Sequence, residues 1–271
     1  MQIGGGDMKA FDFEFDGINL SNFGFMICRF GSEGLQTISN GSKITFNTVS
    51  TSHGAKYELT STDYEGCLET TIQICKNICG SNDFEISLDE LRVLSRWLNR
   101  KGFYKFKILS DEYIDIYFEA SFNINKIEID GKLYGLELEL KTNRPFALQE
   151  PRKIIIENID YNGEKIIQDF SDIEGYIYPE VEITINENGN LTIYNEMENR
   201  VTSINNCVAG EVIKMNYPII ESSIPNREIQ NDFNWNFFRI ANTFRNKFNK
   251  IVISLPCTIK IVYSPTIKVG I

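Results

Sequence analysis

One segment, from Ser87 to Lys101, is patterned as an α-helix, whereas most of the chain is patterned as short β-strands and turns. Ser87 and Glu90 have the spacing of a capping box, in which a hydroxyl and a carboxylate each accept a backbone N–H at the start of a helix. Apolar residues then recur every three or four positions, at Leu88, Leu91, Leu94, Trp97 and Leu98. Gly102 can adopt the left-handed conformation that ends a helix. A single amphipathic helix among strands must bury its apolar face against a sheet, so we predict a mainly β fold with one helix at about residues 87–101.

Length and charge limit the classes of protein. A chain of 271 residues that is 42% hydrophobic can form two domains with separate cores. The net charge of −10 argues against binding to nucleic acid, because phosphate backbones reward clustered cations. The segment from Met1 to Lys9 lacks the pattern of a signal peptide, and no apolar run approaches the ~18 residues of a membrane span. We therefore expect a soluble protein made in the cytosol, with no membrane partner.

The sequence offers no familiar catalytic or metal-binding pattern. Six scattered cysteines predict free thiols rather than a disulfide framework: Cys28, Cys67, Cys75, Cys79, Cys207 and Cys257. The one histidine, His53, lies in a turn rich in Thr and Ser, where an exposed loop residue is the ordinary interpretation. Glu180 and Glu182 could share one face of a strand, but alternating acids usually mark a solvated face. We predict no catalytic residues, no metal and no cofactor.

Strand patterns fill the first half of the chain. Phe11 to Asp16 alternates apolar and acidic residues, and Asp16-Gly17 and Asp130-Gly131 are typical of tight turns. Further strands are predicted at 23–27, 43–49, 55–59, 68–75, 103–109, 114–122, 124–129 and 134–141, with a loop at 31–41. Pro145 and Pro151 interrupt the pattern, so we predict domains at residues 1–148 and 149–271.

The second half is predicted to be a β-sandwich or jelly roll. Strands are indicated at 181–185, 191–193, 203–206, 212–216, 251–254 and 258–263, with no second clear helix. Asn188-Gly189 has the sequence of a type I′ turn, which predicts a hairpin between the first two of these strands.

One segment, from Asn226 to Lys250, combines six aromatic residues with seven asparagines and a local charge of +3. Aromatic residues and Arg dominate interface hot spots, so one interpretation is a partner-binding loop. The candidate residues are Trp235, Phe237, Phe238 and Arg239. The other interpretation uses the helix-like spacing of four apolar residues, which would close the open end of the sandwich: Phe237, Ile240, Phe244 and Phe248.

Several short motifs, in order along the chain from about Lys9, resemble those of the distal tail protein (Dit) family of long-tailed bacteriophages. In the first half they are Phe13-Glu14-Phe15-Asp16-Gly17, Phe23-Gly24-Phe25, the Leu91–Leu98 helix and Arg144-Pro145-Phe146-Ala147. In the second half they are Pro179-Glu180-Val181-Glu182-Ile183, Gly210-Glu211-Val212-Ile213 and Ile259-Lys260-Ile261-Val262-Tyr263-Ser264-Pro265. Their order and spacing carry the resemblance.

The resemblance implies an N-terminal domain that forms a hexameric ring and a C-terminal galectin-like β-sandwich. It implies a structural, non-enzymatic protein of the virion tail tip and baseplate, assembled in the cytoplasm of the bacterial host. Its partners would be five further copies of the chain, the tail tube protein, the tail-associated hub protein and the receptor-binding proteins used in host attachment. A ring of this kind needs sheet edges that pair across subunits, and we expect the strand from Phe11 to Asp16 to be such an edge.

Other functions share these patterns. A carbohydrate-binding module would use the same sandwich, with an exposed aromatic residue such as Trp235 stacked on a sugar. A β-rich glycosidase would need two carboxylates at a fixed separation, such as Glu180 and Glu182. Other phage proteins, of the tail tube or the hub, also form rings from β-rich domains.

Overall fold

The computed structural model describes residues 11–30, 43–51, 56–77 and 83–269. The chain divides into two compact units, one made of Met1–Gln149 with Ile267–Ile271 and the other of Glu150–Thr266. The predicted mainly β fold is confirmed, since strands form most of the regular structure and the described residues include two α-helices. The predicted loop at 31–41, His53 and Cys79 lie outside the described residues.

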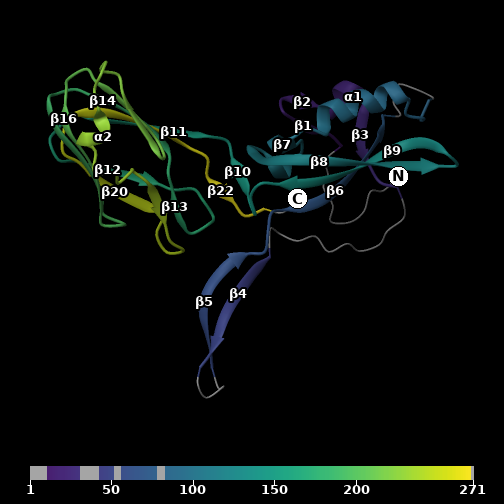
Figure 1. Cartoon of the computed structure of the whole chain (residues 1–271), viewed down its shortest axis with the longest axis horizontal. Coiled ribbons are helices and arrows are strands. Elements are labelled where there is room, and N and C mark those ends of the chain that lie inside the picture. Colours follow the sequence, from purple (N-terminus) through teal and green to yellow (C-terminus); the bar gives the residue numbers. More distant parts are fainter. Residues whose placement is uncertain (1–10, 31–42, 52–55, 78–82, 270–271) are drawn as a thin grey trace. The chain divides into compact units, whose positions relative to one another are not determined.

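The first unit is built on one large sheet with the strand order β2-β1-β7-β8-β9-β6-β3; β10 also pairs with β8, and β22 pairs with β10 (Figure 1). Its strands are β1 (Phe13–Phe15), β2 (Ile18–Asn19), β3 (Phe25–Cys28), β6 (Glu69–Lys76), β7 (Tyr104–Ile108), β8 (Ile116–Ile129), β9 (Lys132–Thr142), β10 (Ala147–Gln149) and β22 (Thr266–Ile267). Two 3₁₀-helices, η1 (Leu20–Phe23) and η2 (Asp111–Tyr113), lie in its connections.

Turn chemistry sets two of the hairpins in this sheet. Asp16 and Gly17, between β1 and β2, both have positive φ, at 52° and 77°. Asp130 and Gly131, between β8 and β9, have the same pair of values. Positive φ at both central residues defines the type I′ turn, so both predicted turns are confirmed. The two strands predicted at 114–122 and 124–129 are wrong as separate elements, because the alternation continues without a turn and forms the single long strand β8.

The helix α1 (Leu88–Leu98) begins where the capping box predicts. The Ser87 N–H donates to Glu90 Oε2 at 2.7 Å, and the Glu90 N–H donates to Ser87 Oγ at 3.3 Å. The helix ends at Leu98, before the predicted end at Lys101, with Asn99 already outside helical geometry at φ −85° and ψ 80°. Arg100 instead turns toward Asp16, with Nη1 2.9 Å from Oδ2.

One face of α1 packs on the sheet around a cluster of aromatic rings. Leu94, Trp97 and Leu98 are buried, whereas Leu88 in the first turn is exposed, so the apolar stripe is shorter than predicted. The Trp97 ring stacks on Phe13 with centroids 5.8 Å apart, and its indole N–H donates to the Phe15 carbonyl at 3.1 Å. This bond satisfies the polar group of a buried indole and joins the helix to the N-terminal strand.

The expectation that the Phe11–Asp16 strand forms a free sheet edge is wrong. β1 lies inside the sheet, where Phe15 pairs with Ile18 of β2 on one side and with Phe106 of β7 on the other. The cause is the tight Asp16-Gly17 turn, which returns β2 along the outer side of β1. Phe13 and Phe15 are consequently fully buried core residues.

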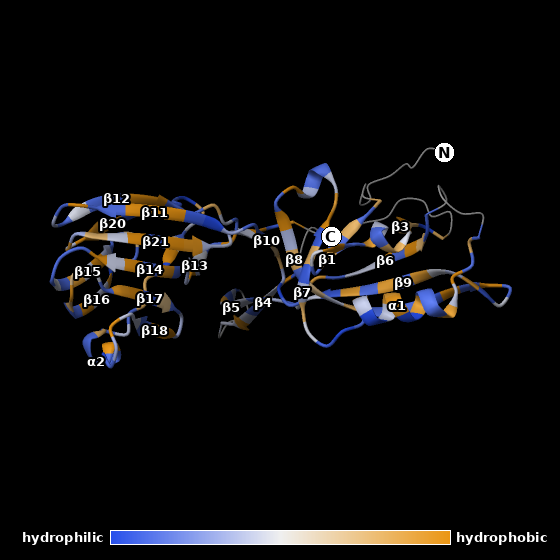
Figure 2. Ribbon diagram, turned by 90° about the horizontal axis from the view of Figure 1, so that it is seen from above, coloured by the Kyte–Doolittle hydropathy of each residue, from blue (hydrophilic) through white to orange (hydrophobic). Residues whose placement is uncertain are grey.

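The second unit is a β-sandwich of a five-stranded sheet, β11-β21-β14-β17-β18, and a four-stranded sheet, β12-β20-β15-β16. Its strands are β11 (Arg152–Asn158), β12 (Gly163–Gln168), β13 (Gly175–Ile177), β14 (Glu180–Ile185), β15 (Gly189–Asn195), β16 (Arg200–Cys207), β17 (Val212–Asn216), β18 (Ile219–Ser222), β19 (Ile240–Asn242), β20 (Phe248–Ile253) and β21 (Cys257–Tyr263). Hydrophobic and hydrophilic residues alternate along these strands (Figure 2), and residues of both sheets share one core. A short helix, α2 (Ile229–Asp232), and the two-stranded β13-β19 sheet complete the unit.

The predicted Asn188-Gly189 hairpin is wrong. β14 pairs with β17 and β21, whereas β15 pairs with β16 and β20, so residues 186–188 cross from one sheet to the other. Both sides of β14 are already occupied by these neighbours, which leaves no edge for β15. The Asn188 side chain instead accepts the Ala209 N–H at 2.7 Å, which secures the crossing.

Candidate assembly surface

The remaining strands of the first unit, β4 (Ile44–Ser50) and β5 (Tyr57–Tyr64), form an antiparallel pair that joins no other described strand (Figure 1). Every residue of both strands is exposed. Within the unit, Tyr64 makes an edge-on contact with Phe146, with ring centroids 6.4 Å apart. A two-stranded hairpin is at best marginally stable alone in water, so this pair calls for a further contact.

The register gives the hairpin two chemically different faces. Ile44 pairs with Tyr64, Phe46 with Thr62, Thr48 with Leu59 and Ser50 with Tyr57. The pairing register shifts between Asn47 and Thr48, and with this shift all four pairs lie on the same side of the hairpin. We call this side the apolar face of the hairpin, and its large residues are Ile44, Phe46, Tyr57, Leu59 and Tyr64. Their exposed fractions run from 36% for Tyr64 to 69% for Tyr57.

The opposite face is mostly polar and internally bonded. Asn47 Nδ2 donates to Ser61 Oγ at 2.9 Å and to Asp63 Oδ2 at 3.0 Å, which places these three side chains on the same side. Val49 is the large apolar residue there. Contiguous exposed apolar surface rimmed by polar groups typically marks an interaction site, so the apolar face is the candidate assembly surface. The sequence predicted strands in this region but not their exposed apolar face. An alternating pattern does not show whether another part of the protein covers the apolar side of a strand.

The structure divides the predicted partner-binding residues into exposed and buried ones. Trp235 is 57% exposed, whereas Phe237 and Phe238 are each only 4% exposed and belong to the sandwich core. The Arg239 guanidinium is bonded to Glu198 at 2.6 Å and lies over the Tyr176 ring, 3.9 Å from its centroid. A partner-binding role therefore stays a prediction for the surface around Trp235 and Arg239, and the two buried rings support it from below.

The helix-like spacing in this segment does not correspond to a helix. Phe237 and Ile240 are buried, but Phe244 and Phe248 are 86% and 55% exposed, and residues 240–242 and 248–253 form strands instead of a helix. The many asparagines have structural roles that the sequence did not indicate. Asn249, fully buried, accepts the Ala241 N–H at 2.9 Å and donates to the Ala241 carbonyl at 2.8 Å, so its amide fixes the segment to the four-stranded sheet.

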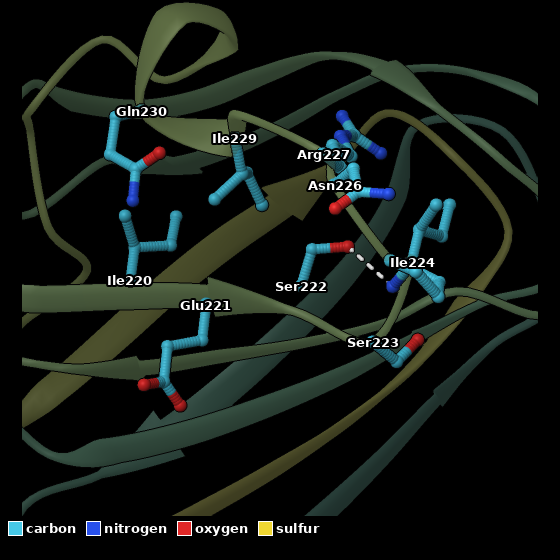
Figure 3. Close-up of a pocket in the computed structure, with 10 residues that line it drawn as sticks. Ile220, Glu221, Ser222, Ser223, Ile224, Asn226, Arg227, Ile229 and Gln230 are labelled. Carbon is cyan, nitrogen blue, oxygen red and sulfur yellow. Dashed lines mark hydrogen bonds between the residues drawn. The ribbon is translucent and has the colours of Figure 1, made fainter.

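A buried ion pair fixes the loop that precedes α2. Glu211, with a side chain 0% exposed, pairs with Arg227 and accepts the Ser222 hydroxyl at 2.5 Å. Arg227 also donates to the Asn205 carbonyl at 2.8 Å and to Asp232 at 3.3 Å. Beside it lies an open depression of about 400 Å³ between β18 and α2 (Figure 3), lined by polar residues together with Ile220, Ile224 and Ile229. Because the guanidinium is already bonded within the protein, the depression presents no unpaired cation to a ligand.

The other predicted residues have structural surroundings. Glu182 lies between Lys214 and Lys260, at 3.7 and 3.9 Å, on the outer side of its sheet. Cys28 and Cys75 lie on the paired strands β3 and β6, and a hydrogen bond from Cys28 lowers the pKa of the Cys75 thiol. Burial raises the pKa of Cys257 to about 12. No group of three or more metal-ligating side chains occurs within the described ranges.

Comparisons with known proteins identify the family. Residues 8–144 match a family described as the phage tail protein N-terminal domain, and residues 146–263 match the phage tail C-terminal domain. Together these matches cover nearly the whole chain, so the chain belongs to this family of phage tail proteins. No curated protein sequence matches it. In the part of the chain that the structure describes, there is no helix of the length and apolarity that a bilayer crossing requires.

The fold is that of a distal tail protein. The chain is similar to the crystal structure of the Dit (gp 19.1) protein of phage SPP1, with a TM-score of 0.61 and 11% identity over 94% of this chain and 99% of that chain. The SPP1 protein is described as a paradigm of the hub adsorption apparatus in phages that infect Gram-positive bacteria. The predicted resemblance is thereby confirmed in both the phage tail family and the fold.

Proposed function

We propose that this tail protein is the distal tail protein of its particle, and that six copies form a ring between the tail tube and the hub. Each copy would use the apolar face of its hairpin to bind the neighbouring copy in the ring. The second unit would then be free to hold receptor-binding proteins at the tail tip. The phage tail family and the Dit fold support this role, and the exposed apolar face is the observation that carries the assembly step.

A ring of identical copies needs a heterologous contact, in which one surface of a copy meets a different surface of the next. A hairpin that pairs with no other described strand suits such a contact, because its apolar face is exposed among the described residues. Burying large apolar side chains contributes roughly 1.5–3 kcal/mol each when they are fully removed from water. Several such residues on one hairpin supply a contact strong enough to be repeated around a closed ring.

The test is the mass of the purified chain in solution by light scattering, with negative-stain images of the same sample. A ring of six would have about six times the 31.1 kDa mass of the chain and a central hole. Phe46→Lys places a charge at the centre of the apolar face and should reduce the assembly to smaller species. Thr45→Lys is the matched control, because Thr45 is the adjacent residue on the polar face, opposite Asp63.

Two results would contradict the hairpin's role. One is a wild-type ring that Phe46→Lys leaves intact, and the other is equal disruption by Thr45→Lys. A wild-type monomer would contradict self-assembly of the isolated chain, and the same measurement with tail tube and hub proteins added would then show whether they drive the ring.

A further inference from the structure

Five aromatic rings of the second unit contact one another in a row, and three of them are exposed at its surface. The rings of Tyr176 and Tyr178 contact edge to face, with centroids 5.5 Å apart. The rings of Tyr178 and Tyr217 stack face to face, with centroids 4.2 Å apart and an interplanar angle of 10°. The Tyr217 ring contacts the buried Phe237 ring with centroids 5.3 Å apart, and the Phe237 and Trp235 ring centroids are 6.5 Å apart. The row comes from three separate segments of the chain, so it is formed by the tertiary fold. Its outer members, Tyr176, Tyr217 and Trp235, are each more than half exposed.

The outer rings are held in place by bonds beneath and beside them. Trp235 has a φ of 60°, a left-handed conformation that is strained for a bulky residue. The flanking Asn234 maintains it, since Oδ1 accepts the N–H groups of Ser203 and Asn236, each at 3.1 Å, and Nδ2 donates to the Val201 carbonyl at 2.9 Å. The fold thus sustains backbone strain that leaves a large indole in water.

At the other end of the row, Arg239 fixes Tyr176. Its guanidinium covers one face of the Tyr176 ring while Glu198 holds it by two bonds, at 2.6 and 2.8 Å. The ring nonetheless stays 56% exposed. Rings fixed before binding lose little conformational freedom when a ligand stacks on them, which is the property of a preformed binding surface.

The chemistry of the row favours a neutral saccharide as its ligand. Aromatic faces stack on the C–H faces of sugar rings, and the hydroxyl of Tyr and the N–H of Trp can bond to sugar hydroxyls at the edges. Among the described residues, Arg239 is the cation placed over a ring of the row, and Glu198 neutralises it. A single-stranded nucleic acid would need stacking rings beside unpaired cations, whereas here the charge of Arg239 is paired with Glu198 and Arg200 Nε donates to the Phe237 carbonyl at 3.2 Å.

We propose that the row from Tyr176 through Tyr217 to Trp235 binds a neutral oligosaccharide chain, with sugar rings stacked on Tyr217 and Trp235. This inference concerns the second unit and does not depend on ring formation by the first. It gives the outer part of a tail protein a direct contact with carbohydrate, in addition to any receptor-binding protein that it holds.

The experiment screens the full-length protein against an array of neutral oligosaccharides and then titrates each one that binds. The intrinsic fluorescence reports on the site, because the chain has two tryptophans and the other, Trp97, is 7% exposed. A bound saccharide should shield Trp235 from quenching by acrylamide. Trp235→Ala and Tyr217→Ala should each weaken binding by about tenfold or more, since each removes one stacking ring.

Phe244→Ala is the matched control, because Phe244 is 86% exposed in the same part of the chain but lies outside the row. It should bind the saccharide like the wild type, and the thermal unfolding of all variants should show that they are folded. The proposal is overturned if no neutral saccharide shields Trp235 at millimolar concentration, or if Trp235→Ala binds as well as Phe244→Ala. It is also overturned if Trp235→Ala changes the mass of the assembly without affecting saccharide binding, which would assign the row to a protein contact.

Discussion

Replacing Arg227 by Met should strongly destabilise the second unit, because it leaves the Glu211 carboxylate buried without its cation. Glu211 has no exposed side-chain surface, and the Arg227 side chain is 10% exposed. After the change, Glu211 keeps the Ser222 hydroxyl at 2.5 Å and the Val208 N–H at 3.1 Å, which stabilise the charge only in part. The loop before α2 also loses the bonds from Arg227 to its other two partners.

The magnitude follows from the burial of the pair. Removing one partner of a buried ion pair costs about 3–5 kcal/mol, of which roughly 1 kcal/mol here is the lost bond to the Asn205 carbonyl. For a domain of about 100 residues each kcal/mol lowers the melting temperature by roughly 4 °C, so we expect a fall of about 12 to 20 °C. Glu211→Gln combined with Arg227→Met removes both charges and should recover all but about 1–2 kcal/mol.

The assay is calorimetric unfolding of the whole chain, with hydrogen exchange of β17 to assign the affected transition to the second unit. Lys214→Met is the control, since Lys214 pairs with Glu182 at 3.7 Å on the surface and should contribute less than about 1 kcal/mol. A loss below about 1 kcal/mol in Arg227→Met, or a double variant as unstable as the single one, would refute the reasoning.

Three further outcomes follow from the structure. Burial raises the pKa of Tyr263 to about 12, so its proton is held more tightly in the folded state than in the unfolded state. The free energy of unfolding should therefore fall as pH rises from about 10 to 12. In urea titrations at alkaline pH, Tyr263→Phe should reduce this dependence of stability on pH. Iodoacetamide at neutral pH should modify Cys75 before the buried Cys257, because the hydrogen bond from Cys28 lowers the pKa of Cys75 whereas burial raises the pKa of Cys257. Peptide mass spectrometry would measure the order of modification. Leu94→Ala should destabilise the first unit by about 2–5 kcal/mol in chemical denaturation, since Leu94 is 1% exposed; a loss near zero would mean that α1 is not packed on the sheet.

Local signals predicted the elements whose cause is local. The capping box of Ser87 and Glu90, the two Asp-Gly turns and the alternation of Val212 to Asn216 each depend on residues a few positions apart. Errors arose where a distant segment decided the outcome. Asn188-Gly189 has the sequence of a hairpin turn, but β14 already has β17 and β21 beside it, and residues far along the chain supply one of these neighbours.

The candidate sites were less predictable than the fold. The sequence singled out the segment around Trp235, yet it could not separate the exposed Trp235 from the buried Phe237, because both are aromatic residues in a loop. It also gave no sign of Tyr176 and Tyr217, which are joined to Trp235 through Tyr178 and Phe237 only in the folded second unit. The apolar face of the hairpin was missed because exposure depends on whether another layer covers a strand.

The sequence by itself determined that the chain is mainly β with one capped amphipathic helix, and its ordered motifs indicated a phage tail protein. These properties follow from hydrogen bonds and periodicities within short stretches, which the order of residues specifies directly. Only the tertiary structure decided which strands are edges, which aromatic rings face water and which charges are buried together. Burial is a property of neighbours that are distant in sequence, so the hairpin's apolar face, the Glu211–Arg227 pair and the aromatic row exist only in the folded chain.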